Sequence, residues 1–171
     1  TETARFEADA FSLDHAGVMK AGGQATVDFA GDILLPVAQI RIESLDLAGA
    51  LPAYVQPFLI DSSFKDIAGS GTIKGDVAID RGLPTRAEFD LESVTIDSAA
   101  AAVSLKGLTG RVNWFDDASR TALAGTIDDD RFLSRLAWDA GRLWGLELGR
   151  VELPFATTGR HFRLLEPVKL P

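Results

Sequence analysis

The sequence has no cysteine among its 171 residues. Without thiols, thiolate metal sites, thiol nucleophiles and disulfides are excluded, although the cellular compartment is left open. Histidine is almost as scarce, with two copies, His15 and His161, and neither has the spacing of a zinc site. Both are interpreted as surface or turn residues. The sequence therefore predicts no metal site and no cofactor.

Long apolar runs and excess positive charge are also missing. No run approaches the about 18 apolar residues that a membrane-spanning helix needs. The 25 acidic residues outnumber the 17 basic ones, for a formal net charge of −8. That balance argues against a nucleic-acid partner, which would require a basic surface. With 46% hydrophobic and 25% charged residues, the composition is that of a globular chain.

Catalytic motifs are absent as well. The chain has no Gly-x-Ser-x-Gly nucleophile elbow. Residues 69 to 71, Gly-Ser-Gly, precede a predicted strand instead of a helix, so we interpret them as a turn and not as a phosphate loop. The acidic stretches 116–117 and 128–130 lack a calcium-loop pattern and are interpreted as solvated turns. We therefore expect a protein that is not an enzyme.

What the sequence does contain is period-two alternation, which is typical of strands. In residues 71 to 80, Ile73, Val77 and Ile79 fall on one face and charged residues on the other. Residues 81 to 84 then read as a turn. Because polar residues alternate with apolar ones in nearly every such segment, the pattern predicts an antiparallel sheet with one apolar and one wet face. We expect nine or ten strands.

One segment has helical spacing instead. Residues 47 to 60 read LAGALPAYVQPFLI, with apolar side chains recurring on one helical face. Pro52 is compatible with a first helical turn, whereas Pro57 would end or kink the helix. The spacing predicts a short amphipathic helix near residues 48–60, packed against the sheet.

The three tryptophans, Trp114, Trp138 and Trp144, fall on predicted strands. Aromatic rings could stack on sugars or contact acyl chains, but a tryptophan on the inner face of a sheet usually belongs to the core. We therefore expect all three in the core.

The alternation slips by one residue in FDLESVTID, residues 89 to 97. The same pattern of apolar, any, apolar, any, any, apolar, any, apolar recurs four times. Its copies start at Phe6, Ile40, Phe89 and Leu146. One extra residue in an alternating strand indicates a β-bulge, which bends the strand and keeps both apolar pairs on the same side. In the third copy Glu92 and Ser93 are the predicted bulge.

Two of these copies belong to a longer internal repeat. RFEADAFSLDHA, from Arg5, aligns without gaps to EFDLESVTIDSA, from Glu88. With an insertion of two residues, the match extends over about 5–29 and 88–114. Each copy reads as a slipped strand, a small-residue turn and a second strand, which is a repeated β-hairpin.

Repeated bulges have two structural readings. Bends in successive strands would curl a sheet around its apolar face into a β-groove or half-barrel. Alternatively, each slip is a corner where a strand passes between the sheets of a closed β-sandwich. We therefore predict a mainly β fold, a curved antiparallel sheet of bulged strands with one short helix, and keep the sandwich as the alternative.

The second half of the chain also resembles a known family. Its glycine-punctuated segments are GSGTIKGDVAIDRGLPTRAEFDLESVTID, LKGLTGRVNW, LAWDAGRLWGLELGRVELPF and GRHFRLLEPVKLP. These hairpins, the Leu-x-Gly-Leu-x-Gly-x-Val-x-Trp turn and the Phe-x-Leu-x-x-Pro strand resemble the repeating β-groove proteins of Gram-negative envelopes. The likeness is to the YdbH-like, AsmA-related group, with relatives TamB and YhdP, and it covers roughly Leu45 to Pro171.

The resemblance implies a periplasmic protein, tethered to the inner membrane, that carries phospholipid between inner and outer membranes along an apolar groove. It implies phospholipid and neighbouring groove segments of the same protein as partners. Residues 1–171 would then be one β-rich domain cut from a longer protein, an expectation that also fits a start at Thr1 without a targeting segment.

The strand pattern is compatible with this function, because a sheet curled around an apolar face could solvate acyl chains. The candidate groove-lining residues are Phe6, Ile40, Ile42, Phe89, Leu91, Val94, Ile96, Trp114, Leu146 and Leu148. Under the sandwich alternative the same chain would be a structural or adhesive module, with Phe89, Leu91, Trp114 and Trp144 sealed in a closed core.

Overall fold

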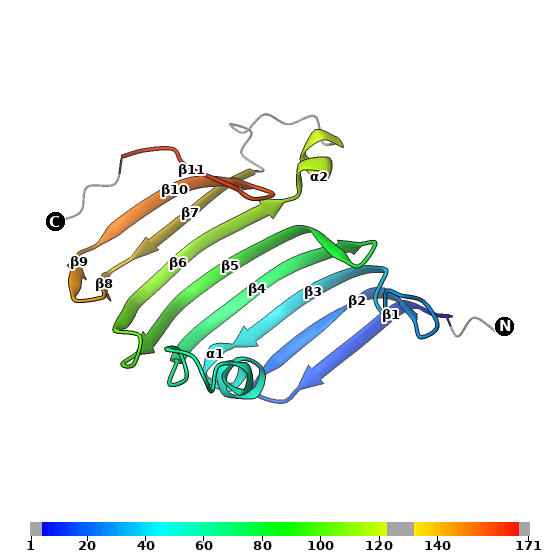
Figure 1. The fold of residues 1–171 in the computed structure, drawn as a ribbon, viewed down its shortest axis with the longest axis horizontal. Coiled ribbons are helices and arrows are strands. Elements are labelled where there is room, and N and C mark those ends of the chain that lie inside the picture. Colours follow the sequence, from blue (N-terminus) through cyan, green and yellow to red (C-terminus); the bar gives the residue numbers. More distant parts are fainter. Residues whose placement is uncertain (1–4, 123–131, 168–171) are drawn as a thin grey trace.

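A computed structural model describes residues 5–122 and 132–167, which form one large antiparallel sheet with short helices (Figure 1). The strands are β1 (Arg5–His15), β2 (Met19–Asp28), β3 (Val37–Asp46), β4 (Ala68–Asp80), β5 (Leu83–Ser98), β6 (Val103–Phe115), β7 (Leu133–Trp138), β8 (Ala140–Leu143), β9 (Leu146–Leu148), β10 (Val151–Thr158) and β11 (His161–Leu164). Their order is β1-β2-β3-β4-β5-β6-β7-β10-β11, with the β8–β9 hairpin attached to β6.

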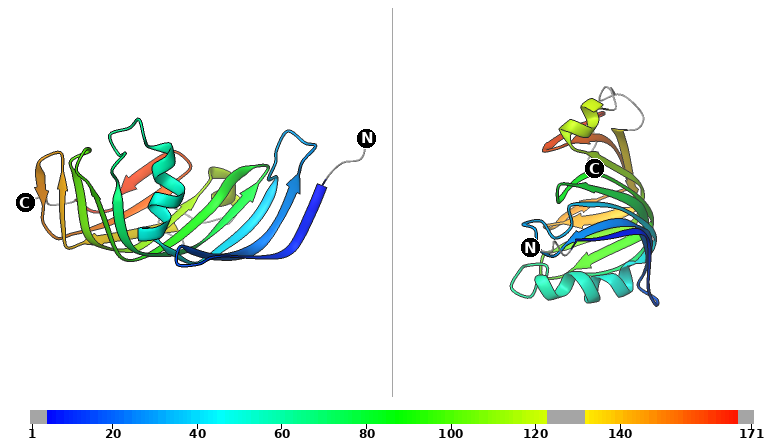
Figure 2. Two further views of the ribbon diagram at one scale, coloured as in Figure 1. Left: turned by 90° about the horizontal axis from the view of Figure 1, so that it is seen from below. Right: turned by 90° about the vertical axis from the view of Figure 1, so that its right-hand side faces the viewer.

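The sheet is open and curved, as the alternation and the bulges predict. Figure 2 shows it bending around a concave side, on which the helical segment after β3 lies. The described residues form a single sheet of 11 strands. The closed β-sandwich, which requires two packed sheets, is therefore wrong as a description of this fold.

Three of the four slipped patterns are bulges. In β1 the pairing with β2 shifts between Ala8 and Phe11. In β3 the pairing with β4 shifts between Ile42 and Leu45. In β5 the shift lies between Leu91 and Val94, so Glu92 and Ser93 form the bulge as predicted. Ser93 has a φ of 50°, which is the left-handed conformation that a bulge residue can adopt.

The fourth slipped pattern is not a bulge, so this prediction is wrong. Leu146 and Leu148 belong to β9, which pairs with β8, whereas β10 begins at Val151 and pairs with β7. The partner chain is also divided, between β7 and β8 at Asp139. A bulge needs a continuous partner to absorb the extra residue, and here both strands of the hairpin break at the same level. This division also raises the strand count above the predicted nine or ten.

Each of the three bulges is bordered by a glycine on the neighbouring strand. The bordering pairs are Phe11–Gly23, Ile42–Gly75 and Leu91–Gly110. A Cβ at any of these glycines would clash with a backbone carbonyl of the strand on its other side: Gln39, Glu88 and Arg135, respectively. Bulges and glycines are the two devices that curve a sheet, and here they are combined in each successive pair β1–β2, β3–β4 and β5–β6.

The helical segment follows β3 directly. It consists of α1 (Leu47–Ala50), a π-helical turn (Leu51–Val55) and a 3-10 turn (Gln56–Phe58). Asp46 caps its start, because its side chain accepts a hydrogen bond from the N–H of Ala48 at 2.8 Å. Pro52 occupies the start of the π-helical turn and Pro57 the final 3-10 turn. The predicted short helix is thus present.

Leu47 and Leu51 of this segment enter a small core with Val94 and Leu108 of the sheet. All four side chains are buried. The helical segment therefore covers one end of the concave face, at β4, β5 and β6.

Two predicted turns are wrong. The Gly-Ser-Gly of residues 69–71 lies inside β4, where Gly71 has a φ of 100° beside the bulge of β5. The acidic pair Asp116–Asp117 starts a second short helix, α2 (Asp117–Ala122), because Asp116 accepts a hydrogen bond from the N–H of Ser119 at 2.7 Å. The other acidic run, 128–130, lies outside the described residues.

The predicted turn at 81–84 is shorter, since Leu83 already pairs with Asp80.

Candidate functional site: the apolar concave face

The register of the sheet collects apolar side chains on one face. Directly paired residues of neighbouring strands point to the same side. One row of paired residues crosses eight strands without interruption: His15, Met19, Leu45, Ile73, Leu91, Gly110, Leu136 and Leu153. A second row comprises Leu13, Ala21, Ile42, Gly75, Phe89 and Val112. The face is therefore apolar across nearly the whole sheet.

This apolar face is the concave one. Val94 and Leu108 contact the helical segment, which lies on the concave side of the sheet (Figure 2). Leu91 and Ile73, which belong to the first row, pack against the same core. Away from the helical segment, the side chains of the two rows are half-buried or exposed, apart from Ala21.

All ten residues predicted to line a groove share this face. Phe6, Ile40, Ile42, Phe89 and Trp114 lie where the helical segment does not cover the sheet, and Phe6 is 60% exposed. Leu91 packs against the core that the helical segment forms with the sheet. Val94 is fully buried beneath the helical segment and Ile96 packs against that core. Leu148 is buried and Leu146 is 66% exposed on the β8–β9 hairpin, which continues the face through the pairs Leu105–Gly141 and Gly141–Leu148.

Several further residues share this face but are not among the ten predicted groove-lining residues. They are Leu13, Met19, Leu45, Ile73, Val77, Leu108, Val112, Leu136 and Leu153. The alternation itself could have identified Ile73, Val77 and Val112. Leu108 was harder to place, because a second bulge in β6 lies between it and Leu105.

One tryptophan is not where it was expected. Trp114 and Trp138 lie half-buried in β6 and β7, but Trp144 is 75% exposed in the turn between β8 and β9. Trp144 and Gly145 both have positive φ, 49° and 86°, as in a two-residue type I′ turn. Because such turns are usually recognised from Asn-Gly or Asp-Gly, the dipeptide Trp-Gly did not predict this one.

The opposite, convex face is polar from β3 to β6. Ion pairs join neighbouring strands there: Arg41–Asp76, Lys74–Glu92 and Arg111–Asp90. Arg111 donates two hydrogen bonds to Asp90, at 2.7 and 2.9 Å, and this contact lowers the pKa of Asp90 and raises the pKa of Arg111. Because these pairs are exposed to water, each contributes little to stability, but together they mark the face that stays hydrated.

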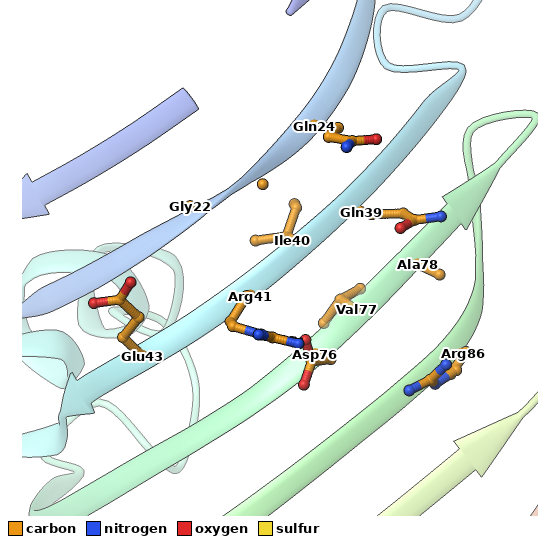
Figure 3. Close-up of a pocket in the computed structure, with 11 residues that line it drawn as sticks. Gly22, Gln24, Gln39, Ile40, Arg41, Glu43, Asp76, Val77, Ala78 and Arg86 are labelled. Carbon is orange, nitrogen blue, oxygen red and sulfur yellow. Dashed lines mark hydrogen bonds and ion pairs between the residues drawn. The ribbon is translucent and has the colours of Figure 1, made fainter. Parts of the chain in front are cut away.

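A cleft of about 490 Å³ lies on the polar face between β2, β3 and β4 (Figure 3). It forms beside Gly22, which has no side chain to fill the space between its neighbours. The Arg41–Asp76 ion pair, at 3.0 Å, crosses it. Amides and opposite charges line this cleft, so it has the character of solvated surface and differs from the predicted apolar site.

Groups suited to metal or acid–base chemistry are dispersed. Over residues 5–122 and 132–167, no three His, Asp or Glu side chains gather as a metal site would require. His15 is exposed at the end of β1, where its Nδ1 lies 2.6 Å from the Tyr54 hydroxyl. His161 is exposed at the start of β11. Within the same described residues, no helix is long and apolar enough to cross a membrane.

No protein-family model, curated protein or solved structure matches this chain. The assignment of function therefore depends on the geometry of the two faces.

Proposed function

We propose that this chain is a non-enzymatic segment that shields or conducts the acyl chains of phospholipids along its concave face. The observation that carries the proposal is the segregation of the two faces. Apolar side chains from eight strands share the concave face, whereas the inter-strand ion pairs share the convex one.

The dimensions of the face suit an acyl chain. The row from His15 to Leu153 crosses eight strands, and seven steps of about 4.8 Å give about 34 Å. The whole hydrocarbon core of a bilayer, two acyl chains deep, is about 30 Å thick. One acyl chain laid across the strands would thus contact only apolar side chains along its length.

The chemistry of the face supports binding without reading a headgroup. Burial of apolar area is non-directional and contributes about 25 cal/mol for each Å² removed from water. The first row contains a single polar side chain, His15, and it lies at the edge strand. Such a surface would select for hydrocarbon and leave the polar headgroup to solvent.

The setting we propose is the one that the sequence resemblance implies, the periplasm of a Gram-negative cell. Neighbouring β-groove segments are the proposed partners. The support for this is that β1, an outer strand of 11 residues, has β2 as its one partner strand in the described structure. An unpaired edge of this length is open to a further strand.

The competing function, a structural or adhesive β-sandwich module, depends on a closed core. The described residues form a single open sheet, which favours the groove function over this alternative.

The test is the recovery of bound lipid. Protein purified from cells and examined by native mass spectrometry should carry phospholipid, and Leu91→Arg should lower the bound fraction about ten-fold by placing a charge on the face. Thr109→Arg adds the same charge on the polar face and should leave lipid binding unchanged. Phe6→Arg, on the exposed edge strand, should weaken binding without unfolding the sheet.

Circular dichroism must first show that each variant is folded. If the folded wild-type chain repeatedly carries no lipid, or if Thr109→Arg lowers binding as much as Leu91→Arg does, the proposed function is wrong.

A further inference from the structure

Six large apolar side chains that are mostly exposed lie on three connecting segments. These rim segments are residues 29–36, between β2 and β3, residues 58–67, from the last residue of the helical segment to β4, and residues 144–146, the β8–β9 turn with the first residue of β9. Their exposed side chains are Phe29, Leu34, Phe58, Ile60, Trp144 and Leu146, which range from 60% exposed for Leu34 to 86% for Phe58.

The rim segments project to one side of the molecule. In the left view of Figure 2 the loop after β2, the loop after the helical segment and the β8–β9 turn all rise from the sheet on its concave side. The right view places the first two of these loops on that same side. They therefore surround the opening of the concave face from different edges of the sheet.

These side chains do not stabilise the fold by burial, since each is mostly in water. They also do not form one continuous patch, because they sit on separate segments around the opening. A stable protein partner generally needs a contiguous contact of about 800 Å² on each side. Separate apolar tips that face the same way suit a fluid, planar surface into which each tip can insert independently.

The charges of the rim segments specify the kind of surface. Residues 29–36 carry one charged side chain, Asp32, and residues 58–67 carry Asp61, Lys65 and Asp66. Residues 144–146 carry none. With an acidic rim and a net charge of −8 for the chain, an anionic surface would repel the protein, whereas a zwitterionic one would not.

We infer that the rim segments dock the protein on the surface of a zwitterionic lipid membrane, with the opening of the concave face toward the lipid. Phe58 and Trp144 are the principal anchors, because aromatic rings are favoured at the boundary between headgroups and acyl chains. The positive-φ turn holds Trp144 at the end of its hairpin, where it can reach that boundary. The docking goes beyond the proposed function and does not require an acyl chain on the concave face.

The experiment is flotation of the full chain with phosphatidylcholine vesicles. Wild-type protein should float with the vesicles, and the double variant Phe58→Ser/Ile60→Ser should bind about ten-fold less. Leu83→Ser is the matched control, because Leu83 is 68% exposed but lies on the polar side of the β4–β5 turn, opposite Asp80. Its binding should equal that of wild type.

Tryptophan quenching separates docking from lipid on the concave face. Phosphatidylcholine with brominated acyl chains should quench Trp144, and Trp144→Phe should remove most of that quenching. Quenching that persists in Trp144→Phe reports Trp114 and Trp138, which lie in the sheet, and would support the proposed function instead of rim docking.

Three results would each overturn the inference. They are no flotation with phosphatidylcholine, equal loss of binding in Leu83→Ser and in Phe58→Ser/Ile60→Ser, and quenching that Trp144→Phe leaves unchanged. Native mass spectrometry of bound lipid is a separate measurement, so a failure of docking and a failure of lipid binding can be told apart.

Discussion

Among single residues, Asp66 joins two distant parts of the chain. Its Oδ1 accepts a hydrogen bond from the Ser98 hydroxyl at 2.6 Å, and its Oδ2 accepts one from the N–H of Ala100 at 2.9 Å. Ser98 is buried, and its Oγ accepts a further bond from the N–H of Ala101. Asp66 thus fixes the segment after the helix to the turn between β5 and β6.

The same contacts make the contribution of Asp66 depend on pH. The bond from Ser98, followed by the bond from Ala100, lowers the pKa of Asp66. A depressed folded-state pKa gives stability that is present above the unfolded pKa of about 3.9 and is lost as pH falls through the folded value. Asp66→Asn should therefore lower the urea midpoint at neutral pH and have progressively less effect in acid. Asp61→Asn, in the same segment, should change it little at either pH.

Sequence patterns place some single residues and not others. Glu92 and Ser93 could be identified because the apolar alternation of their own strand shifts by one residue. A β-bulge accommodates such a shift locally. Trp144 could not be placed, because its exposure follows from a type I′ turn, and Trp-Gly is not a typical sequence for that turn. Hydrophobic character alone assigned it to the core.

At the scale of elements, the pairing of a bulge with a glycine is what bends the sheet. Gly110→Ala should lower the free energy of unfolding by about 3 kcal/mol or more. The new Cβ would clash with the Arg135 carbonyl, and alanine would also have to adopt the positive φ of Gly110. Gly17→Ala is the control, since Gly17 has a φ of 73° and nothing within 4 Å of an added Cβ. Gly17→Ala should lower the free energy of unfolding by about 1 kcal/mol, because alanine is strained at a positive φ but meets no neighbouring atom there. Equal losses in urea unfolding would contradict the clash.

The helical segment has one side chain that stabilises and one that does not. Leu51 is buried against Val94 and Leu108, so Leu51→Ala should cost about 2–4 kcal/mol through lost contacts and a cavity. Phe58 ends the same segment at 86% exposure, and Phe58→Ala should cost about 0.5 kcal/mol or less. Thermal unfolding of the two variants checks this contrast. A large loss for Phe58→Ala would mean that it packs against the fold.

Elements were predictable where their cause is local. The helix could be read from its spacing and its two prolines, and three bulges from the slips. The break between β9 and β10 has the same slipped pattern as a bulge, and only the partner chain, broken at Asp139, distinguishes the two. The sequence of one strand does not determine which strand pairs with it.

For the whole molecule, an open sheet predicts a gradient of stability across its strands. The central strands β4, β5 and β6 are long and paired on both sides, whereas β1 and β11 are edges. Amide hydrogen exchange should be slowest in β5 and fastest in β1 and β11. Equal protection in β1 and β5 would contradict an uncovered edge and would show that β1 is paired in solution.

The exposure of the candidate site residues depends on the whole fold and not on the strand patterns alone. Alternation places the ten lining residues on one face, but exposure depends on what lies above each one. Val94 is fully buried and Phe6 is 60% exposed because the helical segment covers one end of the face and not the other. That difference depends on where the helical segment packs on the sheet, and the alternation within a strand does not predict this.

The pairing of a bulged strand with a glycine-bearing strand gives the sheet a unit of growth. The three predicted bulges, in β1, β3 and β5, each border a glycine in the next strand, β2, β4 or β6. Adding or removing two strands would conserve these pairs and the curvature with them, whereas a single strand would separate a bulge from the glycine that borders it. The surface can therefore change width only in steps of one hairpin, about 9.6 Å, while keeping its cross-section. Duplication of whole hairpins would lengthen such a surface without redesigning it.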